Sequence, residues 1–155
     1  MKIARIAKWA GLALVVAFAA VQVVPVDRTN PAVETEVPAP ADVRSVLRRA
    51  CYDCHSNETV WPWYSRVAPI SWLVARDVHE GREELNFSTW NRLSTKEQVE
   101  AMHESWETVQ EGEMPPWFYL PPHPEARLSP RDRELLSAWS ASARSARSDR
   151  RQGPD

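Results

Sequence analysis

The stretch that decides the fold is ADVRSVLRRACYDCH, residues 41–55. Asp42 can cap a helix here, because its carboxylate can accept hydrogen bonds from the first free backbone N–H groups. The apolar residues that follow recur at helical spacing and share one face; they are Val43, Val46, Leu47 and Ala50. This helix runs directly into Cys51, so it gives residues 51–55 a rigid mount.

Residues 51–55 have the pattern C-x-x-C-H, which is the attachment signature of c-type haem. Thiols three positions apart can each form a thioether with one of the two vinyl groups of a single porphyrin. His55 is then carried beneath the iron, where it can serve as the proximal axial ligand. The sequence therefore predicts one haem c, attached through Cys51 and Cys54 and ligated by His55.

Two other uses of a C-x-x-C pair stay open. A thiol–disulfide redox site usually belongs to a thioredoxin-like α/β pattern, and the sequence has no strand signals of that kind. Half of a zinc site would need a second Cys pair, but the chain has only two cysteines. Its other histidines, His79, His103 and His123, are scattered and lack zinc-knuckle spacing. Haem attachment is the favoured interpretation.

The second axial ligand of an electron-transferring c-type cytochrome is usually Met or His. Met114 is the best candidate, in the run GEMPPW at residues 112–117. The glycine before it allows a turn and the prolines after it stiffen the loop, so the thioether can be held in one place. His123, in PPHP at residues 121–124, is the alternative ligand because it also lies on a stiff loop.

Aromatic residues follow the motif closely, at Trp61, Trp63 and Tyr64. An indole N–H or a phenol there can donate a hydrogen bond to a haem propionate, with Arg66 as a charged partner. The favoured interpretation of each ring is simpler, namely that it walls the haem pocket or the core. The chain has eight Trp, and a flat apolar cofactor would give such rings something to pack against.

The N-terminus has the layout of an export segment. Three basic residues within residues 1–8 precede an apolar run, residues 9–24, that only Gln22 interrupts. Residues 3–26 provide about 24 positions, and roughly 20 suffice to cross a bilayer core. The basic flank stays in the cytoplasm and the rest is exported. We expect an uncleaved single-pass helix in a bacterial inner membrane with the body in the periplasm; a cleaved periplasmic form stays open.

Composition divides the chain into four segments. They are a membrane segment at residues 1–26, an extended Pro-rich linker at 27–41, a haem-binding domain at 42–142 and a disordered Ser- and Arg-rich tail at 143–155. Within the domain, helices are predicted from Asp42 to Cys51, from Pro69 to a stop at Gly81, from a capping box at Ser94 to a stop at Gly112, and onward from Ser129-Pro130.

The predicted fold class is all-α, a small cytochrome c-like helical domain preceded by a membrane helix. Its long loops, at residues 56–68 and 112–128, are rich in Pro and aromatic residues. Net charge is −2, and because residues 1–26 carry only basic groups, the remainder has 16 basic and 21 acidic residues. A mildly acidic body argues against a nucleic-acid partner, which would require a basic stripe.

Several runs together resemble the bacterial haem-binding domain family, a group of short exported proteins. The resemblance spans roughly residues 22–140 and is carried by PVDRTNP at 25–31, CYDCHSNET at 51–59, WPWY at 61–64, APISWL at 68–73, HEGREELNF at 79–87 and GEMPPW at 112–117. It implies haem binding and leaves partners and reaction undefined. The order of elements is also similar to small class I cytochromes c, in which the first and last helices cross; Val43, Val46 and Leu47 would then meet Leu135, Leu136 and Trp139.

The expected function is single-electron transfer, with periplasmic or membrane-bound redox proteins as partners, because an iron held on both sides changes little between its ferric and ferrous states. Two alternatives remain. If Met114 leaves the iron or never binds it, the protein would be a haem peroxidase or a gas or redox sensor. If no haem is attached, Cys51 and Cys54 would form a thiol redox module at the membrane surface.

Overall fold

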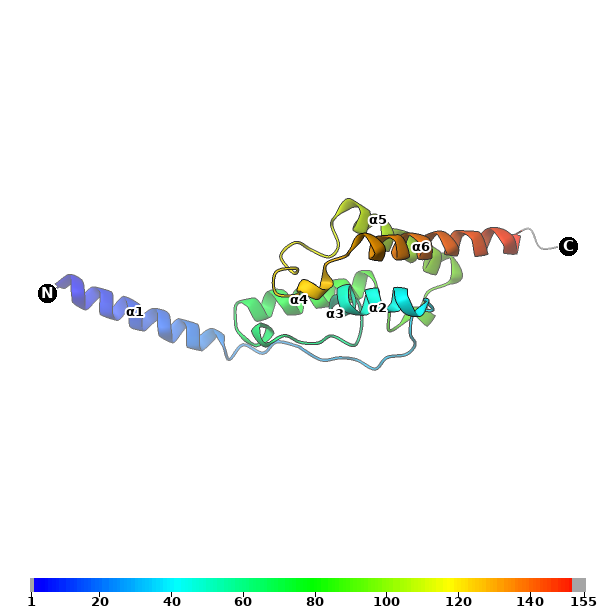
Figure 1. Ribbon diagram of the computed structural model, residues 1–155. Coiled ribbons are helices and arrows are strands. Elements are labelled where there is room, and N and C mark those ends of the chain that lie inside the picture. Colours follow the sequence, from blue (N-terminus) through cyan, green and yellow to red (C-terminus); the bar gives the residue numbers. More distant parts are fainter. Residues whose placement is uncertain (1, 152–155) are drawn as a thin grey trace.

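The computed structural model describes the backbone of residues 2–151 and the side chains of residues 2–143. Its helices are α1 (Lys2–Val21), α2 (Ala41–Ala50), α3 (Tyr52–His55), α4 (Ile70–Glu84), α5 (Thr95–Glu111) and α6 (Pro130–Arg151), with short 3₁₀-helices η1 (Trp63–Arg66), η2 (Trp90–Arg92) and η3 (Pro124–Ala126). An isolated bridge between Thr35 and Thr89 is the extent of β pairing in the described part. The predicted all-α class is confirmed. In Figure 1, α1 projects from one end of the domain and α6 extends past the other.

The core lies where α2 meets α6. All four apolar residues predicted on one face of α2 are buried. Three of them, Val43, Val46 and Leu47, share one buried cluster with Leu136 and Trp139 of α6. Leu135 packs against the edge of this cluster. The predicted packing of the first domain helix against the last is therefore confirmed, and it fixes the motif at the end of α2 relative to the C-terminal part of the domain.

A run of aromatic rings crosses this core from the motif to α6. Ring centroids are 5.4 Å apart between Tyr52 and Phe87, 6.1 Å between Phe87 and Trp90, and 6.4 Å between Trp90 and Trp139. Trp90 and Trp139 are 3% and 4% exposed. The sequence suggested that a cofactor would give the many Trp rings something to pack against. Two of these rings, Trp90 and Trp139, pack in the protein core instead, where each buries extensive apolar surface.

The predicted helix ends are confirmed for α5 and corrected for α4. Ser94 accepts a hydrogen bond from the backbone N–H of Glu97, whose carboxylate accepts one from the N–H of Ser94, so the capping box is present. Gly112 ends α5 with a φ of 80°, a left-handed conformation that favours glycine. Gly81 does not stop α4, which continues to Glu84; this glycine has a packing role at the motif instead.

The segment predicted to be a separate linker lies along the domain (Figure 1). The backbone N–H groups of Glu34 and Thr35 both donate to the carbonyl oxygen of Ser88, at 2.9 and 3.2 Å. Val37 is 1% exposed and belongs to the core. Proline content predicts an extended chain, but it carries no information about the distant residues that accept its hydrogen bonds. At the other end, α6 carries helical backbone through Arg151, across positions predicted as tail; residues 152–155 lie outside the described part.

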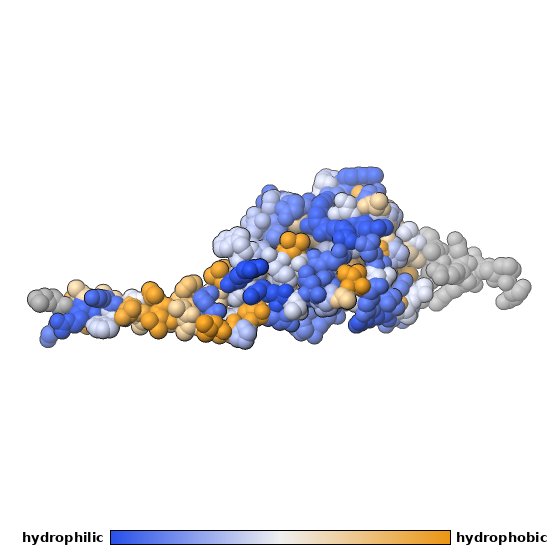
Figure 2. All heavy atoms as spheres, turned by 90° about the horizontal axis from the view of Figure 1, so that it is seen from below, coloured by the Kyte–Doolittle hydropathy of each residue, from blue (hydrophilic) through white to orange (hydrophobic). Residues whose placement is uncertain are grey.

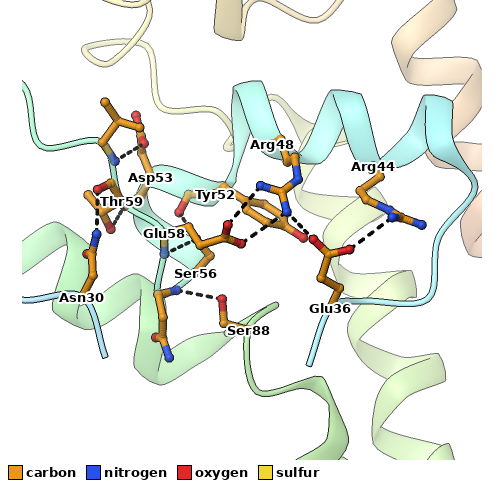
Figure 3. A network of polar contacts seen from close by, with 12 residues as sticks. Asn30, Glu36, Arg44, Arg48, Tyr52, Asp53, Ser56, Glu58, Thr59 and Ser88 are labelled. Carbon is orange, nitrogen blue, oxygen red and sulfur yellow. Dashed lines mark hydrogen bonds and ion pairs between the residues drawn. The ribbon is translucent and has the colours of Figure 1, made fainter. Parts of the chain in front are cut away.

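Ion pairs join the same segment to α2 and to the chain after the motif (Figure 3). Arg48 of α2 pairs with Glu36 on one side and with Glu58 on the other, and Arg44 also pairs with Glu36. The Arg48 guanidinium lies 4.9 Å from the ring centroid of Tyr52. The side chains of Arg44, Arg48 and Glu36 are about 40% exposed, so each ion pair contributes at most about 1 kcal/mol to the free energy of unfolding. Their main effect is to hold three separate parts of the chain in register.

The role of the segment can be tested at Val37. We expect Val37→Asp to lower the free energy of unfolding by about 3 kcal/mol or more, because it places an unpaired carboxylate in the core. Urea unfolding of the full chain in detergent micelles, followed by far-UV circular dichroism, measures this change. Val33→Asp is the matched control, since Val33 is 44% exposed on the same segment and should change stability by less than about 0.5 kcal/mol. Equal effects at both positions would show that the segment is not part of the core.

Candidate functional site

The motif forms a single helical turn at the junction of α2 and α3. The backbone N–H groups of Cys54 and His55 both donate to the carbonyl oxygen of Cys51, at 3.2 and 2.9 Å. Cys51 and Cys54 are free thiols. One turn therefore carries both thiols and the imidazole, and the packing of α2 against α6 sets its position.

His55 is held in the state that an iron ligand requires. Its Nδ1 lies 3.1 Å from the carbonyl oxygen of Leu85, at the end of α4, and because a carbonyl only accepts, Nδ1 carries the proton and donates. Burial lowers the pKa of His55, against the opposing effect of the Leu85 and Gly81 carbonyls. The ring is therefore neutral at pH 7, and the lone pair of Nε2 remains for a metal. A backbone carbonyl on the second nitrogen is a common way of orienting a ligating histidine.

Gly81 lets α4 approach the motif closely. A Cβ added at Gly81 would lie 2.8 Å from the carbonyl oxygen of Cys54 and 3.1 Å from its Cβ. Helix α4 can pass this near only because residue 81 has no side chain. The sequence offered a signal for this, since a glycine inside a helical pattern costs about 1 kcal/mol and usually has a packing reason.

The thiols are poorly suited to thiol–disulfide exchange. Burial raises the pKa of Cys51 to about 12 and that of Cys54 to about 11. Both thiols are therefore protonated at neutral pH, whereas exchange requires the thiolate, which catalytic C-x-x-C sites favour by lowering a pKa.

Asp53, between the two cysteines, fixes the motif to both long loops. Its Oδ1 accepts a hydrogen bond from the backbone N–H of Val60 at 2.9 Å, and its Oδ2 accepts one from the hydroxyl of Tyr119 at 2.7 Å. Burial and this hydrogen bond to Asp53 raise the pKa of Tyr119 far above its usual value. Sequence reasoning missed Tyr119, because nothing in a loop sequence shows that the loop returns to the motif.

His123, the alternative iron ligand, has polar partners at both nitrogens. Its Nε2 is 2.6 Å from the hydroxyl oxygen of Tyr64, and its Nδ1 is 3.3 Å from Oε1 of Glu125. Its ring also stacks on Tyr119, with centroids 4.1 Å apart and planes 9° apart. Tyr64 and His123, which are 59 positions apart in the sequence, are thus brought together. Binding an iron through Nε2 of His123 would require breaking its contact with the Tyr64 hydroxyl.

Met114 lies just beyond the end of α5 with an accessible side chain. Its backbone N–H donates to the carbonyl oxygen of Thr108 at 3.2 Å, which ties the loop to the last turn of α5. The Met114 side chain is 37% exposed. Trp117 and Phe118, on the same loop, are also exposed and pack edge to face. Tyr119 follows them directly and binds Asp53, so this apolar loop is anchored to the motif.

The remaining predicted residues divide between structure and surface. The indole N–H of Trp61 donates to Oδ1 of Asn30 at 3.2 Å, so it serves the N-terminal segment. Trp63 is 78% exposed and packs its edge on Tyr64. Arg66 is exposed at the end of η1. His79 and His103 each lie near a glutamate one turn later on their own helix, at 3.3 and 2.9 Å.

Arg82 holds the chain on either side of the site. Its Nε donates to the carbonyl oxygen of Ser56 at 2.8 Å, one of its Nη groups donates to the carbonyl oxygen of Thr29 at 3.0 Å, and the other donates to the side chains of Asn30 and Thr59 at 2.8 and 2.9 Å. Burial lowers the pKa of Arg82. Helix α4 therefore binds both the exit of the motif and the N-terminal segment through one guanidinium.

The side chains of the motif suit an iron that is already held by a porphyrin. In the part of the chain that the structure describes, no group of three or more His, Cys, Asp and Glu side chains is placed to hold a metal ion. The motif offers one neutral imidazole and two thiols, which are the groups needed to bind and link a porphyrin that already holds iron. The residues present fit a haem.

One turn of a helical domain thus presents the groups with which a protein attaches and ligates a haem. A family model described as haem-binding domain matches residues 16–142, which is most of the chain. The chain belongs to this haem-binding domain family. Comparison with curated proteins and with solved structures finds no match in either set.

Proposed function

We propose that this protein binds one haem c, covalently attached through Cys51 and Cys54, and that it transfers single electrons. The observation that carries the proposal is the neutral His55 with Nδ1 on the carbonyl of Leu85, one residue from a free thiol. A haem, when bound, supplies an iron that can gain and lose one electron. The chain's own part is to position the thiols and to present Nε2 of His55.

Met114 is the proposed second axial ligand. Its side chain is accessible and its loop is tied to α5 at one end and to Asp53 at the other. His123 is a weaker candidate because the Tyr64 hydroxyl occupies its Nε2. A Met/His pair raises the potential of the iron and suits an electron carrier. Trp117 and Phe118 would then gain a flat apolar partner.

The proposed location is the periplasmic face of a bacterial inner membrane. Helix α1 has 20 residues and is long and apolar enough to cross a bilayer. Its basic residues, Lys2, Arg5 and Lys8, all precede its apolar part, which favours a cytoplasmic N-terminus and an exported domain. Redox proteins of the periplasm or the membrane are the proposed partners.

Met114→Ala tests the axial ligand and the mode of function together. In the oxidised wild type we expect a weak far-red charge-transfer band from sulfur to ferric iron, and we expect the variant to lose it and to bind CO when reduced. Visible spectra of the exported chain, oxidised and reduced, measure both properties. Met102→Ala is the control, since Met102 packs beside the core. A wild type without the band that binds CO readily would contradict the electron-carrier proposal and favour an open, reactive iron.

A further inference from the structure

The end of α1 is bound to the domain at one place. The side-chain amide of Gln22 donates to the carbonyl oxygen of Ala68 at 3.2 Å and accepts from the N–H of Ala68 at 3.0 Å. A few residues later, Arg28 donates to the carbonyl oxygen of Ser65 at 3.2 Å. The chain leaving α1 is therefore fixed beside η1 and the start of α4, as Figure 1 shows at the end of the domain nearest α1.

The domain surface at this place is apolar and exposed. Trp63 is 78% exposed, Ile70 47% and Leu73 51%. Trp63 is two residues from Ser65, which Arg28 binds. Ile70 is two residues from Ala68, which Gln22 binds. The Cα atoms of Trp63 and Ile70 are therefore within about 8 Å of the Cα atoms of those bound residues. Val24, beside the end of α1, is 47% exposed. We call Val24, Trp63, Ile70 and Leu73 the anchor-side face.

This face continues the apolar surface of α1. None of the residues of α1 is buried against the rest of the protein. In the space-filling view its apolar atoms form a nearly continuous strip that reaches the edge of the domain (Figure 2). A helix of 20 residues is about 30 Å long, which matches the hydrocarbon core of a bilayer. After Lys8 the next charged residues are Asp27 and Arg28, so the hydrocarbon ends shortly after Val21, close to where Gln22 and Arg28 bind the domain. The anchor-side face therefore lies at the level of the headgroups.

We propose that the anchor-side face rests on the lipid headgroups of the membrane that α1 crosses. This inference depends on the proposal that α1 spans the membrane. Trp63 has the amphipathic ring that is enriched at membrane interfaces, and Ile70 and Leu73 would bury in the upper acyl region beside it. Arg66, exposed at the end of η1, can pair with lipid phosphates. The domain is thus attached by its surface as well as by its anchor.

Site-specific photocrosslinking in the full haem-loaded chain tests this contact. A benzoylphenylalanine replaces Trp63 or Ile70, and the protein is placed in nanodiscs of phosphatidylcholine and phosphatidylglycerol. After irradiation, mass spectrometry of the chain identifies covalent lipid adducts. We expect lipid adducts at both positions, several-fold more abundant than with the same probe at Val33, which is 44% exposed on the domain surface.

A probe at Val15 in the middle of α1 separates this inference from the one on which it rests. Val15 is 65% exposed, so it must give lipid adducts if α1 spans the bilayer. Adducts at Val15 without adducts at Trp63 and Ile70 would overturn the docking proposal and leave the anchor intact. Adducts of the probe at position 63 with the haem or with the chain itself, in place of lipid adducts, would also overturn it. If Val15 gives none, the anchor fails and the docking proposal fails with it.

Discussion

A chain carrying both Cys51→Ala and Cys54→Ala is expected to contain no covalently attached haem. The two thiols are the free cysteines of the chain, and each would form one thioether, so their removal leaves His55 as the only attachment point on this turn. Haem staining after denaturing electrophoresis measures covalent attachment, and the pyridine haemochrome spectrum counts thioethers. Each single variant should keep one thioether and show the spectrum shifted accordingly.

The matched control for this experiment is Ser45→Ala, on the exposed side of α2, which should keep the full complement of haem. All chains must come from cells able to mature c-type cytochromes. A double variant that still stains after denaturation would refute attachment through these thiols. A haem-free wild type from the same cells would refute the proposed function, and a disulfide between Cys51 and Cys54 in that protein would favour the thiol redox alternative.

Gly81→Val is expected to impair both stability and haem loading. The first added carbon would already lie 2.8 Å from the carbonyl oxygen of Cys54, which is a backbone atom and cannot move without shifting the motif. Overpacking of this kind costs about 1–3 kcal/mol. Displacing α4 would also move the carbonyl of Leu85 away from Nδ1 of His55. We expect reduced haem per chain and a lower midpoint of urea unfolding.

Gly11→Val provides the comparison with the same substitution at an open position. A Cβ at Gly11 meets no atom within 4 Å, so haem loading and domain unfolding should stay unchanged. Haem per chain, from absorbance against total protein, and far-UV circular dichroism in urea give the two readouts. Full haem loading and unaltered stability in Gly81→Val would mean that α4 does not position the motif.

Local signals in the sequence predicted the main helices of the domain well. The capping box at Ser94 and the stop at Gly112 act within a few residues, so a single stretch contains all the information that they require. The docking of α2 on α6 followed from the order of elements alone, which is similar to that of small cytochromes c. The motif of Cys51, Cys54 and His55 likewise lies within five consecutive residues, so it can be read from the sequence directly.

The features that could not be predicted depend on partners far along the chain. Gly81 was interpreted as a helix stop. Its close contact in the folded protein is with Cys54, which is 27 positions away in the sequence, and a glycine alone does not reveal such a contact. Tyr119 reaches Asp53 across 66 positions. Leu85 contributes its backbone carbonyl, which every residue type has, so no choice of side chain marks it as the partner of His55.

Under the proposed function, the hydrogen-bonded N-terminal segment would also set where an electron is exchanged. A free, flexible linker of about 15 residues would let a domain wander by about 20 Å from its anchor. Here Asn30, Glu34 and Thr35 are bonded to the domain, and Gln22 binds Ala68. With α1 in a bilayer, the motif would travel freely along the membrane plane but stay at a constant height above it. A redox partner would then have to present its own cofactor at that height, so encounter becomes a two-dimensional search.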